Sequence, residues 1–305
     1  MGQCETIPGM ISKRTFMSLP VQEVRDLVTQ NQKPVTGIFL ADGNRRLTMA
    51  LTGLSPDCDG FYDAYLTIIT GYFKKNLRIF FSHGLTNLFF PLFGSSLLKR
   101  NEKYKRTVIP ELTRILFEDE AWFRFYRRHD IRIKYYGTPE ILHDAFPDWK
   151  GIDQITRMVD QTAGHRTHTL YFGFFSDPWG LNHSLPPGSG PDRQGAIEGY
   201  YGEAVHPADF FINSTRTEGL GALPPFITGK ETRIYTLAAP GVWALDRTVF
   251  RAILFDLIFG SSSPPYPLAA GMENDILSLK TFYTKNKHKF IGSGKPIGRF
   301  WGLHV

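Results

Sequence analysis

The chain has 305 residues, of which 42% are hydrophobic and 21% charged, and its formal net charge is +6. This length and composition allow one large domain with a full core and exclude a disordered or low-complexity chain. The basic balance favours an anionic partner such as a phosphate-bearing small molecule, and because no DNA- or RNA-binding motif occurs we expect no nucleic-acid partner.

Hydrophobic periodicity predicts that helices and strands alternate along the chain. Within the region 101–129, which has a helical pattern, Pro110 is expected to mark a kink or a break. The alternation predicts a single α/β domain with a six-stranded, largely parallel sheet flanked by helices. Ligands of such sheets bind at the carboxyl ends of the strands, where Asp42, Phe93 and Asn213 would converge. Helices are predicted over 21–29, 59–83, 101–129, 152–162, 194–203 and 246–259, and strands over 35–41, 85–93, 131–136, 168–175, 209–212 and 233–238.

Three regions follow from this pattern. An N-terminal segment covers 1–30, the main domain covers 31–260, and a C-terminal extension over 261–305 either packs on the domain or acts as a lid. The extension has no regular pattern. A loop over 176–192 is rich in proline and glycine, and loops of that length are more often functional or mobile than structural.

The end of the first predicted strand carries the most chemical information. A short apolar run, typical of a strand buried on both faces, stops at Asp42-Gly43-Asn44, and Arg45 and Arg46 follow. Where a strand end meets a helix start, backbone N–H groups gather. One carboxylate and two guanidinium groups at that place suit a diphosphate with bound Mg²⁺. The alternative is an ordinary turn with a capping aspartate and solvated arginines.

Cysteine content and the N-terminal sequence bear on localisation. Only Cys4 and Cys58 occur, which excludes a disulfide framework and fits a reducing compartment. The N-terminal segment lacks the apolar centre of a signal peptide, and the most apolar stretch is too short to span a bilayer, so we expect a cytoplasmic protein. The first six residues match the minimal myristoylation pattern, so peripheral membrane contact is an alternative to a chance match.

Several blocks of sequence form a recognisable set. They are Asp42-Gly43-Asn44-Arg45-Arg46, Tyr62-Asp63-Ala64-Tyr65, Pro91-Leu92-Phe93, Ile197-Glu198-Gly199-Tyr200-Tyr201-Gly202-Glu203 and Ala208-Asp209-Phe210-Phe211-Ile212. The block over 197–203 is the most specific, since no general fold requirement demands it. With these blocks the chain resembles the cis-prenyltransferase (undecaprenyl diphosphate synthase-like) superfamily, and most of all its branch of tuberculosinyl adenosine transferase and diterpene synthases.

The resemblance implies a homodimeric enzyme with an apolar tunnel beside the sheet, which acts on a prenyl diphosphate with Mg²⁺ as cofactor. Asp42 would hold Mg²⁺ and the diphosphate leaving group, and Tyr65 and Tyr62 would lie near the developing carbocation. Aromatic faces in a dry pocket stabilise such a cation. Core packing is the alternative role for both tyrosines. The residues that would bind substrate are Gly43, Asn44, Arg45, Arg46, Phe93 and Arg216.

One departure from the superfamily pattern narrows the predicted activity. Chain-elongating members bind isopentenyl diphosphate through Arg-x-Ser-Gly-Glu-x-Arg after the fifth strand, where this chain has Asn213-Ser214-Thr215-Arg216-Thr217-Glu218-Gly219. Because the first arginine is missing, a second diphosphate would lack its main cationic clamp. We therefore expect ionisation of one allylic diphosphate, from geranyl to geranylgeranyl in length, followed by quenching with water, ring closure or transfer to a small acceptor.

Two alternatives stay open at this point. The chain can be a cis-elongating prenyl diphosphate synthase with a degenerate second site, or a non-catalytic partner subunit of a cis-prenyltransferase. Glu231 lies near the position of a carboxylate that elongating members use for Mg²⁺, and its role is left open.

Overall fold

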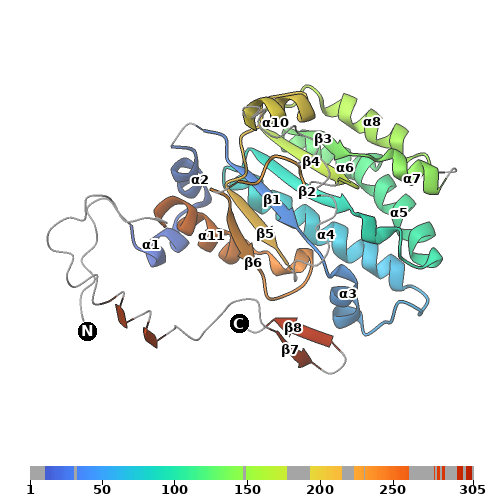
Figure 1. Ribbon diagram of the computed structural model, residues 1–305, viewed down its shortest axis with the longest axis horizontal. Helices are drawn as coiled ribbons and strands as arrows, with labels where there is room; N and C mark the ends of the chain where they lie inside the picture. Colours follow the sequence, from blue (N-terminus) through green and yellow to red (C-terminus); the bar gives the residue numbers. More distant parts are fainter. Residues whose placement is uncertain are drawn as a thin grey trace, which may run out of the picture.

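The computed structural model describes most of the chain (Figure 1). The described residues are 11–30, 33–146, 149–176, 193–214, 223–229 and 231–260, with 278, 280–281, 284–285, 294–297 and 300–303 near the C-terminus. The loop over 177–192, Arg216 and most of the predicted C-terminal extension lie outside these residues.

Six strands form one sheet in the order β3-β4-β2-β1-β5-β6, and every neighbouring pair is parallel. This confirms the predicted α/β class and strand number. The strands are β1 (Thr36–Leu40), β2 (Asn87–Phe93), β3 (Ile131–Gly137), β4 (His168–Phe174), β5 (Phe210–Asn213) and β6 (Arg233–Thr236).

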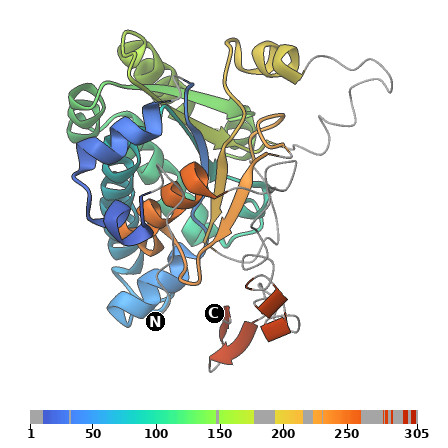
Figure 2. The same ribbon diagram turned by 90° about the vertical axis from the view of Figure 1, so that its left-hand side faces the viewer.

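Two hydrophobic cores cover the two faces of the sheet, because successive side chains of a strand point to opposite faces. Phe39 and Phe90 belong to the larger core, whereas Ile38 and Phe89 belong to the smaller core under α10. The helices that precede β2, those between β2 and β4, and α11 pack on the larger core. Figure 2 shows α10 apart from the other helices. The helices are α1 (Lys13–Ser18), α2 (Val21–Thr29), α3 (Asn44–Thr52), α4 (Phe61–Ser82), α5 (Glu102–Phe117), α6 (Glu120–Arg128), α7 (Glu140–Ala145), α8 (Gly151–Thr162), α10 (Arg193–Tyr201) and α11 (Arg247–Phe259), with short 3₁₀ turns η1 (Ser95–Leu97) and η2 (Val242–Ala244).

The expected break at Pro110 is wrong. Helix α5 runs through Pro110, and the break comes at Asp119, whose carboxylate accepts hydrogen bonds from the N–H groups of Ala121 and Trp122 and so starts α6. Pro110 and Arg106, whose carbonyl would accept the missing bond, are both exposed. Water can therefore replace the lost hydrogen bond, which makes a proline in this helix tolerable.

The C-terminal extension also differs from its predicted irregular form. Two short strands, β7 (Gly294–Ile297) and β8 (Phe300–Leu303), pair antiparallel there. Elsewhere, no helix in the described part of the chain is long and apolar enough to cross a membrane.

The register of the sheet brings the predicted ligand edge together. Leu40, at the end of β1, pairs with Asn213, and Asn213 pairs with Thr236 at the end of β6. On its other side β1 pairs with β2, which ends at Phe93. Asp42, Phe93 and Asn213 therefore converge at one edge, as predicted.

Candidate active site at the carboxyl edge of the sheet

A sharp turn joins β1 to α3. Gly43 has a φ of +84° and stands at the N-cap of α3, and its N–H donates to Oδ1 of Asp42 at 2.6 Å. A Cβ at Gly43 would lie 2.6 Å from Cβ of Pro240. Both the positive φ and this close approach require glycine here. The turn leaves the side chain of Asp42 exposed at the sheet edge.

Hydrogen bonds clamp this turn to the loop that follows β6. Asn44 donates from Nδ2 to the carbonyl of Ala41 at 2.8 Å and accepts at Oδ1 from the N–H of Val242 at 3.0 Å. The carbonyl of Asp42 accepts from the N–H of Gly241 at 2.6 Å and from Oγ of Ser214 at 3.0 Å. Asn44 is thus bound by the backbone at both amide atoms, which makes it a positioning residue for the turn.

Positive charge surrounds Asp42. A hollow at the protein surface, which we call the polar hollow, is lined by Asp42, Arg45, Arg46 and Arg100 together with Gly43 and Asn44. The arginines come from the first turn of α3 and from the segment after η1. Guanidinium groups bind phosphate oxygens bidentately, so the polar hollow has the charge and the donors to bind a diphosphate.

A second space, which we call the apolar cavity, adjoins the polar hollow and extends between α4, α5 and the sheet. It encloses about 790 Å³, its open mouth included. Asp42, Asn44, Tyr65, Arg100 and Tyr104 line both spaces. The residues that line only the apolar cavity are mostly hydrophobic and include Ile69, Phe73, Phe90, Leu92, Phe93, Leu97, Leu112 and Leu116.

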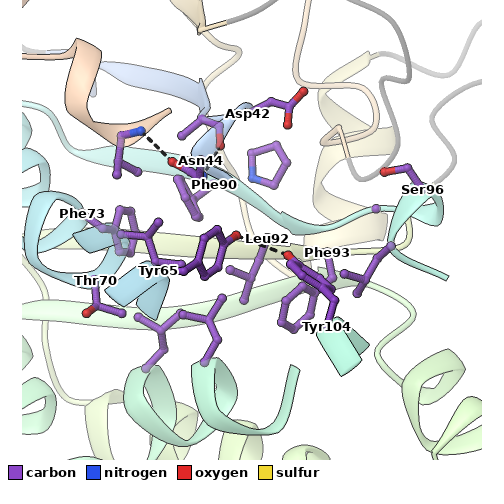
Figure 3. Close-up of a pocket in the computed structure, with 18 of the residues that line it drawn as sticks. Asp42, Asn44, Tyr65, Thr70, Phe73, Phe90, Leu92, Phe93, Ser96 and Tyr104 are labelled. Carbon is purple, nitrogen blue, oxygen red and sulfur yellow. Dashed lines mark hydrogen bonds between the residues drawn. The ribbon is translucent and has the colours of Figure 1, made fainter. Parts of the chain in front are cut away.

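Two tyrosines stand at the boundary between these spaces. The hydroxyl oxygens of Tyr65 and Tyr104 lie 3.3 Å apart and share a hydrogen bond (Figure 3). Burial raises the pKa of Tyr65 well above its usual value and also raises the pKa of Tyr104. Both are therefore neutral phenols at physiological pH. Cζ of Arg45 lies 5.8 Å from the centre of the Tyr104 ring.

Among the other residues that the sequence singled out, the structure places Tyr62, a predicted site residue, and Glu231, whose role was left open. Tyr62 is buried, but it lines neither the polar hollow nor the apolar cavity; its ring makes an edge contact with Tyr104 at 5.9 Å. Glu231 precedes β6 and so lies at the amino edge of the sheet, opposite to Asp42. Arg216 falls outside the described residues.

The fit of this site to Mg²⁺ depends on the substrate. Among the described residues no group of three or more His, Cys, Asp or Glu side chains could hold a metal ion. Asp42 offers one exposed carboxylate, and one of its oxygens accepts the Gly43 N–H. A hard cation with water and phosphate oxygens as its other ligands fits such a single carboxylate.

The chain is similar along nearly its whole length to two known proteins. The chain is 28% identical to tuberculosinyl adenosine transferase of Mycobacterium tuberculosis over 306 residues, which covers 96% of this chain and 98% of that protein. It is 25% identical to (+)-kolavelool synthase of Herpetosiphon aurantiacus, covering 94% and 93%. No family model matches the chain.

Solved structures share the fold. A probable undecaprenyl diphosphate synthase from Campylobacter jejuni has a TM-score of 0.53 at 13% identity and covers 76% of this chain and 98% of its own. Lavandulyl diphosphate synthase from Lavandula x intermedia, solved with dimethylallyl diphosphate, has a TM-score of 0.50 at 11% identity, covering 79% and 98%. The similarity to these relatives along nearly the whole chain and the shared fold support placing this chain in the cis-prenyltransferase superfamily. They agree with the resemblance seen in the sequence.

The sequence pattern missed two residues of this site. Arg100 had no assigned role, yet it lines both spaces. Tyr104 had no assigned role. Both follow β2, which ends at the same sheet edge as β1, and this shared edge is the signal that could have indicated them.

Proposed function

We propose that this protein ionises one allylic prenyl diphosphate and quenches the resulting cation with water, by ring closure or by transfer to a small non-phosphorylated acceptor. The observation that carries the proposal is the shared boundary of the polar hollow and the apolar cavity. A diphosphate in the polar hollow would have its prenyl chain in the apolar cavity, with the scissile carbon–oxygen bond beside Tyr65 and Tyr104.

The chemistry needs opposite environments at the two ends of that bond. The leaving diphosphate gains charge, which Arg45, Arg46 and Arg100 would stabilise, with Asp42 holding the substrate's Mg²⁺. Bound Mg²⁺ would neutralise further charge on the diphosphate. The carbocation left behind is stabilised by aromatic faces, and the buried rings at the boundary offer them. Because both phenols stay protonated, their contribution is a π face and a hydroxyl dipole.

The end of β5 favours one diphosphate over two. Asn213 is fully buried, and the hydroxyl of Ser214 donates to the carbonyl of Asp42. Neither residue supplies the cation that a second diphosphate needs. Cis-elongation is the alternative function, and Arg216 would have to serve it alone.

A non-catalytic partner subunit is the alternative of another class. Such a subunit does not need a diphosphate-binding hollow, but this chain keeps one, and its presence supports a catalytic role. The hollow is lined by Asp42, Arg45, Arg46 and Arg100. A homodimer and peripheral membrane contact stay predictions, which light scattering and vesicle sedimentation would test.

The testing experiment incubates the purified protein and Mg²⁺ with geranyl, farnesyl or geranylgeranyl diphosphate, with and without isopentenyl diphosphate, and analyses the extract by mass spectrometry. We expect one diphosphate to be consumed alone, giving an alcohol or a cyclic hydrocarbon. Longer products that require isopentenyl diphosphate would establish elongation instead. No consumption under any of these conditions, with or without a panel of nucleoside acceptors, would contradict the proposal.

A matched pair of variants tests the role of Asp42. Asp42→Asn should abolish turnover and leave the protein folded, since the lost interaction is with the metal and the leaving group. Asp153→Asn, in the first turn of α8, is the control for removing one surface carboxylate. Normal turnover by Asp42→Asn would refute the role.

A further inference from the structure

A third hollow lies on the outer side of the α4–α5 pair. We call it the outer groove; its walls come from α4, α5 and α6. Leu66, Ile115 and Trp122 supply apolar surface there, while Asp63, Lys74 and Glu111 supply charge. Lys74 is held over Trp122, with Nζ 4.4 Å from the ring centre. The outer groove is therefore amphipathic.

Thr70 of α4 lines both the outer groove and the apolar cavity. On one face of α4, Tyr65, Ile69 and Phe73 line the apolar cavity. On the neighbouring face, Gly71 and Lys74 line the outer groove. In Figure 3 Thr70 lies on the far side of the apolar cavity from Asp42.

The facing helix shows the same division. Leu112 and Leu116 of α5 line the apolar cavity, whereas Glu111 and Ile115 line the outer groove. The seam between α4 and α5 is thus bordered by a hollow on each side.

The side chain of Thr70 is small and has no polar tie across this seam. Its hydroxyl donates to the carbonyl of Leu66 within α4 at 2.6 Å. Next to it, Gly71 has no side chain, and a Cβ built there would meet no heavy atom within 4 Å. A change of side chain at position 70 can therefore widen or fill the seam without breaking a hydrogen bond between the helices.

We propose that the deep end of the apolar cavity opens sideways through the α4–α5 seam at Thr70, and that Thr70 limits the length of the prenyl chain. This inference rests on the proposed function and adds a specificity-determining residue to it. A chain longer than the cavity passes Thr70 and lays its tail against Leu66, Ile115 and Trp122 in the outer groove. Apolar tails gain from that surface, because burying each methylene is favourable.

Substrate selectivity tests the inference. Thr70→Ala should raise the ratio of kcat/KM for geranylfarnesyl over geranylgeranyl diphosphate at least about tenfold, which is the range for one or two methyl groups in an apolar pocket. Thr70→Leu should shift the preference towards farnesyl diphosphate. Thr67→Ala is the control, because Thr67 lines only the outer groove, and its ratios should stay within about twofold of wild type.

Loss of structure alone gives another pattern. If Thr70 only supported the helix, Thr70→Ala and Thr70→Leu would lower turnover of every substrate by the same factor. Ratios of kcat/KM that equal those of the wild type would therefore overturn the inference. An inactive wild type would instead contradict the proposed function.

A binding measurement distinguishes failure of this inference from failure of the proposed function. A geranylfarnesyl thiolodiphosphate, which cannot ionise readily, should change the fluorescence of Trp122, while the farnesyl analogue should not. The difference should vanish in Trp122→Phe. Equal signals from both analogues would overturn the inference whether or not the wild type is active.

Discussion

The hydrogen bonds of Asn44 lead to a quantitative prediction. Asn44→Ala removes the acceptor for the Val242 N–H and the donor for the Ala41 carbonyl. A lost hydrogen bond costs about 0.5–1.5 kcal/mol, and a buried group left unpaired costs about 1–3 kcal/mol. Because Asn44 is half-buried, water can reach part of the gap. We therefore expect the free energy of unfolding to fall by about 1–3 kcal/mol.

Turnover should fall by more than this loss of stability explains. The clamp sets the position of Asp42 and Arg45, and a misplacement of about 1 Å can cost about 100-fold in rate. Urea unfolding gives the stability, and diphosphate release under saturating substrate gives kcat.

A control at the opposite sheet edge separates the two effects. Asp130 accepts hydrogen bonds from the N–H groups of Thr167 and Arg166, at 2.8 and 3.3 Å. Asp130→Ala should therefore destabilise the fold by a similar amount and leave kcat unchanged. If Asn44→Ala kept full kcat, or lost kcat without losing stability, the positioning role of Asn44 would be refuted.

Three further predictions concern the turn, the tyrosine pair and pH. Gly43→Ala should lose turnover at least about tenfold through its clash with Pro240, whereas Gly53→Ala, with a φ of +72° but open space, should lose only about 1–2 kcal/mol of stability; equal kcat in both would contradict the clash. Tyr65→Phe should alter the rate or product mixture, and an unchanged product profile by mass spectrometry would leave Tyr65 with a packing role only. Burial lowers the pKa of His168 to about 4 from the usual 6.5, so the unfolded chain binds its proton at a higher pH than the folded protein does. The free energy of unfolding should therefore fall, by up to about 3 kcal/mol, as the pH drops from about 6.5 to about 4. The free energy of unfolding, measured with urea across this pH range, should fall less steeply with pH in His168→Asn than in the wild type. An equal dependence on pH in both proteins would assign the effect to other groups.

Local sequence determined the parts of the site that depend on one strand end. The run before Asp42 is apolar because β1 is buried on both faces, and its end at Asp-Gly-Asn could be read directly. The same holds for Phe93 at the end of β2. In both cases the strand pattern and the turn chemistry indicate the same structure.

Residues whose place depends on distant segments were not predictable in this way. Arg100 lines the site from the segment after η1, which follows β2, and no local pattern around Arg100 indicates that the chain stays at this sheet edge. Tyr62 and Tyr65 lie nearly on one face of α4 and both pack against Tyr104 of α5, but only Tyr65 lines the apolar cavity, a difference that the spacing along α4 does not show. The role of Glu231 was left open because its match to the carboxylate of elongating members shifts by a residue or two with the alignment. The structure places it just before β6, at the amino edge of the sheet.

The clamp at Asp42 has a consequence for how the protein is made. Its partners, Ser214 and Val242, stand 172 and 198 positions after the residues that they bind, Asp42 and Asn44. Contacts of such long sequence separation form slowly, because a long loop must close first. During synthesis from the N-terminus the turn after β1 leaves the ribosome early, yet it has no clamp until β5, β6 and the loop after them have emerged. Nascent chains that end before Val242 should therefore lack a formed diphosphate site, even where their first helices have already packed.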